Sequence, residues 1–135
     1  MQSEQSRPVP RTVHQYLAGE MVIVIDCADT ARSAAFWTAV LGYVTAGPGN
    51  GHYAALLPAN GTGIEVLLQQ VPDSKQGKNR VHIDLRTSDL AAETERVVSL
   101  GAARLTSEPL IEDGLQWHVC ADPDGNEFCV LQPLA

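Results

Sequence analysis

The chain has 135 residues, of which 44% are hydrophobic, and it carries a formal net charge of −7. That length suits one domain, which buries roughly two-thirds of its unfolded surface. The acidic balance argues against nucleic-acid and anionic membrane partners, because both require a basic face. No apolar run approaches the roughly 20 residues that span a bilayer. The first residues lack the apolar core of a signal peptide, so we expect a cytoplasmic location.

Composition divides the chain into an arm and one domain. Residues 1–20 are polar and contain two prolines, which predicts a flexible N-terminal arm. Residues 21–134 form the single predicted domain, with module one at 21–71 and module two at 80–134. The polar residues 72–79 between them are typical of a linker.

Module one begins with a strand at 21–27 that is apolar apart from Asp26, which predicts that both faces of the strand are covered. A helix with a broad apolar face is predicted at 28–41, and a glycine-rich turn cluster follows at 47–51. Strands are predicted at 52–57 and 63–70, joined by a loop that contains Asn-Gly, a turn signal.

Module two repeats this order of elements. Val81, Ile83 and Leu85 alternate with polar residues, which indicates a strand with two different faces. A helix begins near Asp89, whose carboxylate suits an N-cap, and ends at Gly101 as a C-terminal glycine would. The remaining extended segments are predicted at 104–112, 115–121 and 127–131.

The two modules are copies of one unit. Both helices end in Leu-Gly, at 41–42 and at 100–101. Positions 22, 24 and 26 of the first strand correspond to positions 82, 84 and 86 of the later one. Glu65-Val66-Leu67 resembles Cys129-Val130-Leu131, so we align the last strands on Glu65 and Cys129.

The copied unit, the helix ends VLGY and SLGA and the closing segment DPDGNEFCVL together resemble one superfamily. It is the vicinal-oxygen-chelate group of glyoxalase, bleomycin-resistance and extradiol-dioxygenase proteins, and the segment KNRVHIDL looks like its glyoxalase-like branch. The resemblance covers nearly all of 21–133. It implies an α+β fold of two tandem βαβββ modules, whose mixed sheets form a cupped cleft. It also implies that a homodimer is frequent.

The resemblance further implies a metal held by His, Gln or Glu from the first and last strands of each module. His82 and Glu65 suit such positions, but the other two carry Val22, which has no donor atom, and Cys129. A divalent metal held for catalysis normally needs about three protein ligands. We therefore predict no metal cofactor. If Zn, Fe, Mn or Ni is bound, His82 and Glu65 hold it, with a Cys129 thiolate or water completing the shell.

Other residues are candidates for binding or catalysis. His82 and Glu65 could form a general-base pair, or Glu65 could simply face solvent. Asp84 shares a strand face with His82 and could orient it or a ligand, or stand exposed at the rim. Tyr53 and Trp117 lie on strands that would line the cups, which suits stacking of a planar ligand as well as plain packing.

Three functions follow from these residues. We favour a protein that binds a small organic molecule in the cleft without a metal, as the resistance-type members of the superfamily do. One alternative is a metal-dependent lyase, isomerase or dioxygenase of the glyoxalase type. The other is a metal-free enzyme that uses His82 or Glu65 as the base. The three cysteines are odd in number and form no CxxC pair, so we predict buried, reduced thiols.

Overall fold

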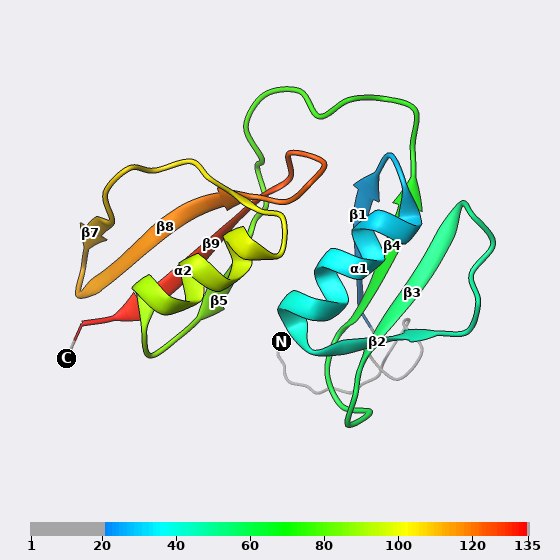
Figure 1. Ribbon diagram of the computed structural model, residues 1–135, viewed down its shortest axis with the longest axis horizontal. Coiled ribbons are helices and arrows are strands. Elements are labelled where there is room, and N and C mark those ends of the chain that lie inside the picture. Colours follow the sequence, from blue (N-terminus) through cyan, green and yellow to red (C-terminus); the bar gives the residue numbers. More distant parts are fainter. Residues whose placement is uncertain (1–20, 135) are drawn as a thin grey trace, which may run out of the picture.

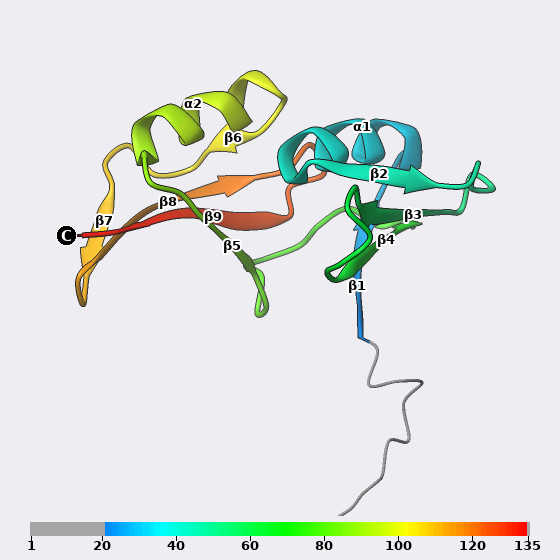
Figure 2. The same cartoon turned by 90° about the horizontal axis from the view of Figure 1, so that it is seen from below.

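The computed structural model describes residues 21–134, and the arm predicted at 1–20 lies outside the described residues. Within this part, the chain forms two mixed sheets, and one face of each sheet is covered by a helix (Figures 1 and 2). The α+β class with two modules is therefore confirmed. Neither helix in the described part is long and apolar enough to cross a membrane.

Module one has the strand order β1-β4-β3-β2, in which β1 is parallel to β4 and the other pairs are antiparallel. Its elements are β1 (Val22–Cys27), α1 (Thr30–Leu41), β2 (Tyr43–Ala46), β3 (Tyr53–Pro58) and β4 (Glu65–Gln70). The strand β2 was not predicted from the sequence. This strand follows directly on the helix and has only four residues, too few for a clear alternation.

Module two has the order β5-β9-β8-β6, with β7 paired to β8 and β5 parallel to β9. Its elements are β5 (Ile83–Arg86), α2 (Leu90–Ser99), β6 (Ala103–Arg104), β7 (Leu110–Glu112), β8 (Leu115–Ala121) and β9 (Glu127–Pro133). The strand β5 begins at Ile83, later than predicted. Val81 is 84% exposed and His82 lies just before the strand, so neither is held in the sheet ladder.

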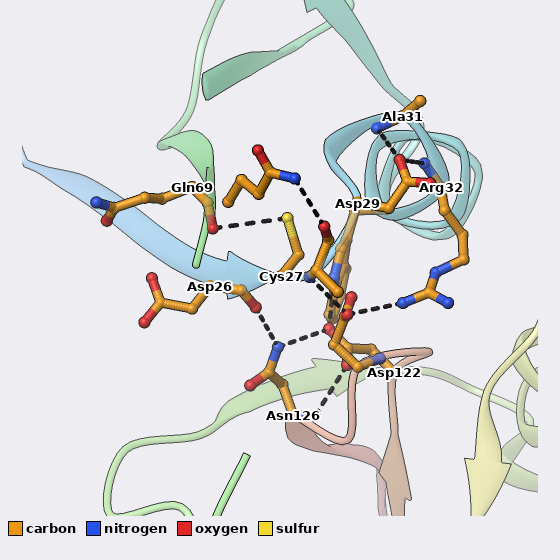
Figure 3. Close-up of polar contacts among 12 residues, drawn as sticks. Asp26, Cys27, Asp29, Ala31, Arg32, Gln69, Asp122 and Asn126 are labelled. Carbon is orange, nitrogen blue, oxygen red and sulfur yellow. Dashed lines mark hydrogen bonds and ion pairs between the residues drawn. The ribbon is translucent and has the colours of Figure 1, made fainter. Parts of the chain in front are cut away.

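The helix ends follow local chemistry. The Asp29 carboxylate accepts hydrogen bonds from the backbone N–H groups of Ala31 and Arg32, at 2.9 and 3.2 Å (Figure 3). The helix α1 therefore begins after this N-cap, at Thr30 rather than at 28. Asp89 caps α2 in the same way, as predicted. Gly42 ends α1 with a φ of 69°, a conformation that favours glycine.

Each helix covers only one face of its sheet. In β1, Ile25 and Cys27 are buried beneath α1, whereas Val22 and Val24 are 38% and 49% exposed on the other face. The prediction that β1 is covered on both faces is therefore wrong, because no second layer packs on that side within the described residues. The largest fully buried side chains of the core are Trp37, Phe128, Leu56, Leu68, Val97 and Val130.

Hydrogen bonds from module two hold both ends of the helix α1. At the N-terminal end, Asp124 Oδ1 accepts hydrogen bonds from the Ala28 backbone N–H at 2.9 Å and from Arg32 Nη2 at 2.7 Å. At the C-terminal end, Arg96 of α2 donates to the Val40 carbonyl oxygen at 2.8 Å. A carboxylate at the N-terminus and a guanidinium at the C-terminus both complement the helix dipole.

A buried carboxylate in the tight turn before β9 completes this contact. Asp122 is 3% exposed, and its Oδ2 accepts hydrogen bonds from Trp37 Nε1 at 3.0 Å and Asn126 Nδ2 at 3.1 Å. Its Oδ1 accepts from the backbone N–H groups of Asp124 and Asn126. Asn126 also donates to the Asp26 carbonyl oxygen at 2.9 Å (Figure 3). Charge-assisted bonds thus join the two modules in a fixed orientation.

Candidate ligand-binding site

The face of module two that points away from α2 contains a cavity of about 410 Å³. Alternation along β8 places Trp117 and Val119 on this face, while Cys120 is buried on the helix side. The cavity therefore has an apolar wall and one polar end. The wall residues are Leu110, Leu115, Trp117, Val119 and Leu131, and the polar residues are Lys78, His82, Asp84, Glu127 and Cys129.

Three side chains converge at the polar end. The His82 Nδ1 atom lies 2.9 Å from Asp84 Oδ1, and both side chains are about half-exposed. Asp84 lies directly opposite Cys129 in the parallel pairing of β5 with β9. One donor atom from each of the three residues lies within 4.8 Å of the others. The sheet register therefore brings together an imidazole, a carboxylate and a thiol.

The Cys129 thiol is held in its protonated form. Burial disfavours the thiolate, and the Asp84 carboxylate disfavours it further by its charge and by accepting the thiol hydrogen. Together these effects raise the pKa of Cys129 to about 11. Because the thiolate is the reactive form of cysteine, Cys129 is a poor nucleophile at neutral pH.

A second polar pair closes the same end of the cavity. Lys78 Nζ donates to Glu127 Oε1 at 3.0 Å, and this hydrogen bond lowers the pKa of the Glu127 carboxyl. The Asn79 side chain donates to the Glu127 carbonyl oxygen at 3.2 Å. Sequence reasoning missed both members of the pair, since Lys78 belongs to the predicted linker. Strand alternation was the available signal for Glu127, which shares a face with Cys129 and Leu131.

The register corrects the alignment of the two modules. Val22 lies opposite Glu65 in module one, and Asp84 lies opposite Cys129 in module two. Since positions 22 and 82 correspond, the counterpart of Glu65 is Glu127, two residues before Cys129. The alignment of Glu65 with Cys129 is therefore wrong. A shift by two residues keeps every side chain on the same face, so the apolar pattern alone does not reveal it.

The predicted site residues fall into two groups. His82, Asp84, Trp117 and Cys129 line the cavity of module two. Val22, Tyr53 and Glu65 lie instead on the uncovered face of the module-one sheet, which we call the open face. Val24 and Leu57 are exposed on the same face. The structure does not bring Glu65 into the cavity that His82 lines.

The cysteines agree with the prediction of buried, reduced thiols. Cys27, Cys120 and Cys129 are all free and buried. Burial raises the pKa of Cys27 and of Cys120 as well. Cys27 lies close to the contact between the modules, where its thiol donates to the Gln69 carbonyl oxygen at 3.6 Å (Figure 3). Of the three, only Cys129 lines the cavity described above.

Comparisons with known proteins agree on one family. A family model described as a glyoxalase-like domain matches residues 22–131. A glyoxalase/bleomycin resistance protein/dioxygenase family enzyme from Burkholderia phytofirmans is 13% identical, with a TM-score of 0.69 over 84% of this chain and 97% of that chain. The fosfomycin resistance protein FosX from Listeria monocytogenes, in complex with Mn(II) and 1S,2S-dihydroxypropylphosphonic acid, is 19% identical. Its TM-score is 0.67, over 85% of this chain and 90% of that chain.

A third structure, TioX from Micromonospora sp. ML1, is 17% identical, with a TM-score of 0.59 over 86% of this chain and 99% of that chain. No curated protein sequence matches the chain. At these identities the solved structures establish the fold, while ligand and chemistry must be argued from the site itself.

Proposed function

Because the chain belongs to the glyoxalase-like domain family, within the fold of the vicinal-oxygen-chelate proteins, we propose that it binds a small organic molecule in the module-two cavity without a metal. The cavity carries this proposal. Its volume of about 410 Å³ lies within the range of small-molecule sites, and its wall is apolar with polar groups at one end. The indole of Trp117 offers a flat surface on which a planar ligand can stack.

The test is a thermal-shift screen with planar aromatic compounds, in which a bound ligand raises the melting temperature. Trp117→Ala should abolish the shift. Tyr53→Ala removes an aromatic side chain from the open face and serves as the matched control, because Tyr53 does not line the cavity. If no compound stabilises the protein, or if both variants weaken binding equally, the cavity is not the binding site.

We also propose that the protein is a homodimer in which a second copy covers the open face of module one. Val22, Val24, Tyr53 and Leu57 expose apolar surface there, which a partner would remove from water. Val24→Lys should shift the mass in light scattering from dimer to monomer. A wild-type protein that is monomeric at micromolar concentration would contradict this arrangement. The cytoplasmic location stays a prediction.

A metal-dependent enzyme is the second candidate, and the His82, Asp84 and Cys129 cluster favours it. Nitrogen, oxygen and sulfur donors within 4.8 Å of one another suit zinc, provided that the Cys129 thiol loses its proton. A bound metal would supply Lewis-acid polarisation of substrate oxygens. Elemental analysis after zinc reconstitution decides between the candidates, with Cys129→Ser and His82→Ala expected to lose any bound zinc. A protein that takes up no metal has no such site.

A metal-free enzyme is favoured by the hydrogen bond between His82 and Asp84. The carboxylate holds the Nδ1 proton of the imidazole and leaves Nε2 as an acceptor, the arrangement of an oriented general base. Its signature would be turnover that chelators leave unchanged and that His82→Ala abolishes. Glu65→Gln tests the second predicted base, which lies on the other sheet.

A further inference from the structure

The pair of Asp84 and His82 at the polar end of the module-two cavity offers hydrogen-bond acceptors. Asp84 can only accept when it is ionised, and it lies 2.9 Å from His82 Nδ1. A neutral imidazole that donates from Nδ1 has an acceptor at Nε2. The Cys129 thiol, which lies within 4.8 Å of the Asp84 carboxylate, is only a weak donor. A ligand group that lies beside Asp84 and His82 Nε2 must therefore donate hydrogen bonds.

The charges at the polar end of the cavity also favour a ligand that carries a positive charge. Lys78 is the one cationic side chain of Lys or Arg type among the cavity residues, and Glu127 neutralises it at 3.0 Å. Of the two carboxylates in the cavity lining, Asp84 is the one that no Lys or Arg side chain pairs. The chain as a whole carries a formal charge of −7, which also attracts cations. Trp117 on the adjoining wall adds an indole, whose face attracts a cation as well.

We propose that the ligand of this cavity is an organic cation, a planar or apolar body that carries a protonated nitrogen directed at Asp84. This inference rests on the proposed function and specifies the ligand class for the same site. The nitrogen donates hydrogen bonds to the Asp84 carboxylate and to His82 Nε2, and the apolar body contacts the wall formed by Leu115, Trp117 and Leu131. An anionic or purely acceptor ligand would face like charge and unpaired acceptors.

Three probes with one ring system test the charge of the ligand. They are the cation 2-(1-naphthyl)ethylamine, the neutral 2-(1-naphthyl)ethanol and the carboxylate 1-naphthaleneacetate. Isothermal titration should show that the amine binds at least about tenfold more tightly than the alcohol, since a charge-assisted hydrogen bond contributes more than a neutral one. The acetate should bind most weakly. This ranking is measured on the unmodified protein, so it does not depend on whether a variant folds.

The variant Asp84→Asn should reduce the preference for the amine over the alcohol to about twofold or less, because the carboxylate charge is gone while the apolar wall remains. Glu95→Gln is the matched control. It removes the same charge from α2, on the opposite face of module two, and should keep the full preference for the amine.

The outcomes separate this inference from the proposed function. If the alcohol or the acetate binds as tightly as the amine, the cavity binds organic molecules but the cation assignment is wrong. If none of the three binds at millimolar concentration, both are wrong. Stoichiometric uptake of zinc that blocks the amine would overturn the organic cation in favour of a metal. A preference for the amine that survives Asp84→Asn would contradict the role of this carboxylate.

Discussion

The contact between the two modules depends on the Asp122 carboxylate, and Asp122→Asn tests it with almost no change of shape. The carboxamide NH₂ group would replace Oδ2 and face two donors, Trp37 Nε1 at 3.0 Å and Asn126 Nδ2 at 3.1 Å. Turning the amide over would instead place NH₂ against the backbone N–H groups of Asp124 and Asn126, at 2.9 and 2.8 Å. Either orientation of the amide loses two hydrogen bonds.

The loss of stability in Asp122→Asn depends on how deeply the donors to this carboxylate are buried. Hydrogen bonds to charged groups contribute about 1.5–3 kcal/mol each, and a buried donor left without a partner costs about 1–3 kcal/mol. Trp37 is 1% exposed, so water cannot replace its lost acceptor, whereas the Asn126 side chain can turn. We therefore expect Asp122→Asn to lower the free energy of unfolding by about 3–4 kcal/mol, a large part of the roughly 5–15 kcal/mol typical of a domain.

Urea unfolding followed by circular dichroism measures this loss. Asp113→Asn is the control, because Asp113 lies in an exposed turn at a φ of 52°, which asparagine tolerates; it should change stability by less than about 0.5 kcal/mol. In a Trp37→Phe background the indole donor is absent, so Asp122→Asn should cost about 1–2 kcal/mol less. A loss below about 1 kcal/mol, or strictly additive effects of the two substitutions, would refute the reasoning.

Three further predictions concern the ends of α1 and the cavity. Gly42→Ala should lower stability by about 1–2 kcal/mol in urea unfolding through backbone strain alone, because an added Cβ would meet no atom within 4 Å at a φ of +69°; an unchanged midpoint would contradict this. Arg96→Lys loses the forked contact with Glu93 and α1. Arg96 lowers the pKa of Glu93, so the pair stabilises the fold above the ordinary carboxyl pKa, and this contribution is lost as pH falls through the lowered value. The difference in melting temperature between Arg96→Lys and wild type should therefore shrink in acid. Cys129 should react slowly with iodoacetamide, and its raised pKa should leave stability unchanged below pH 9 and reduce it, by on the order of 2 kcal/mol, as pH rises towards 11. Asp84→Asn should speed the alkylation, and an unchanged rate would show that Asp84 does not hold the thiol proton.

Much of the fold could be predicted from local sequence. Asp29 and Asp89 mark the helix starts because a carboxylate satisfies free backbone N–H groups wherever a helix begins. Gly42 marks a helix end because its φ is positive, while the alternation of apolar residues marks β8 and a short apolar run marks β9. These signals act over a few residues, so they can be recognised along the chain. The repetition of the unit then predicts two similar modules.

The site depended more on the tertiary structure. His82 and Cys129 were identified as candidates from the family resemblance, and Asp84 and Trp117 from their places on strands; the structure places all four at one cavity. The inclusion of Lys78 with its partner Glu127 was not predicted, because a linker residue carries no periodic pattern.

The sequence by itself determined the helix caps, the approximate positions of most helices and strands, and that the unit occurs twice. Only the tertiary structure decided the register, which pairs Glu65 with Val22 and Cys129 with Asp84, and the contact that buries Asp122 against Trp37. The physical reason is the range of the interactions. Caps and alternation depend on neighbours along the chain, whereas a strand shifted by two residues keeps the same pattern, so long-range contacts alone select among the possible pairings.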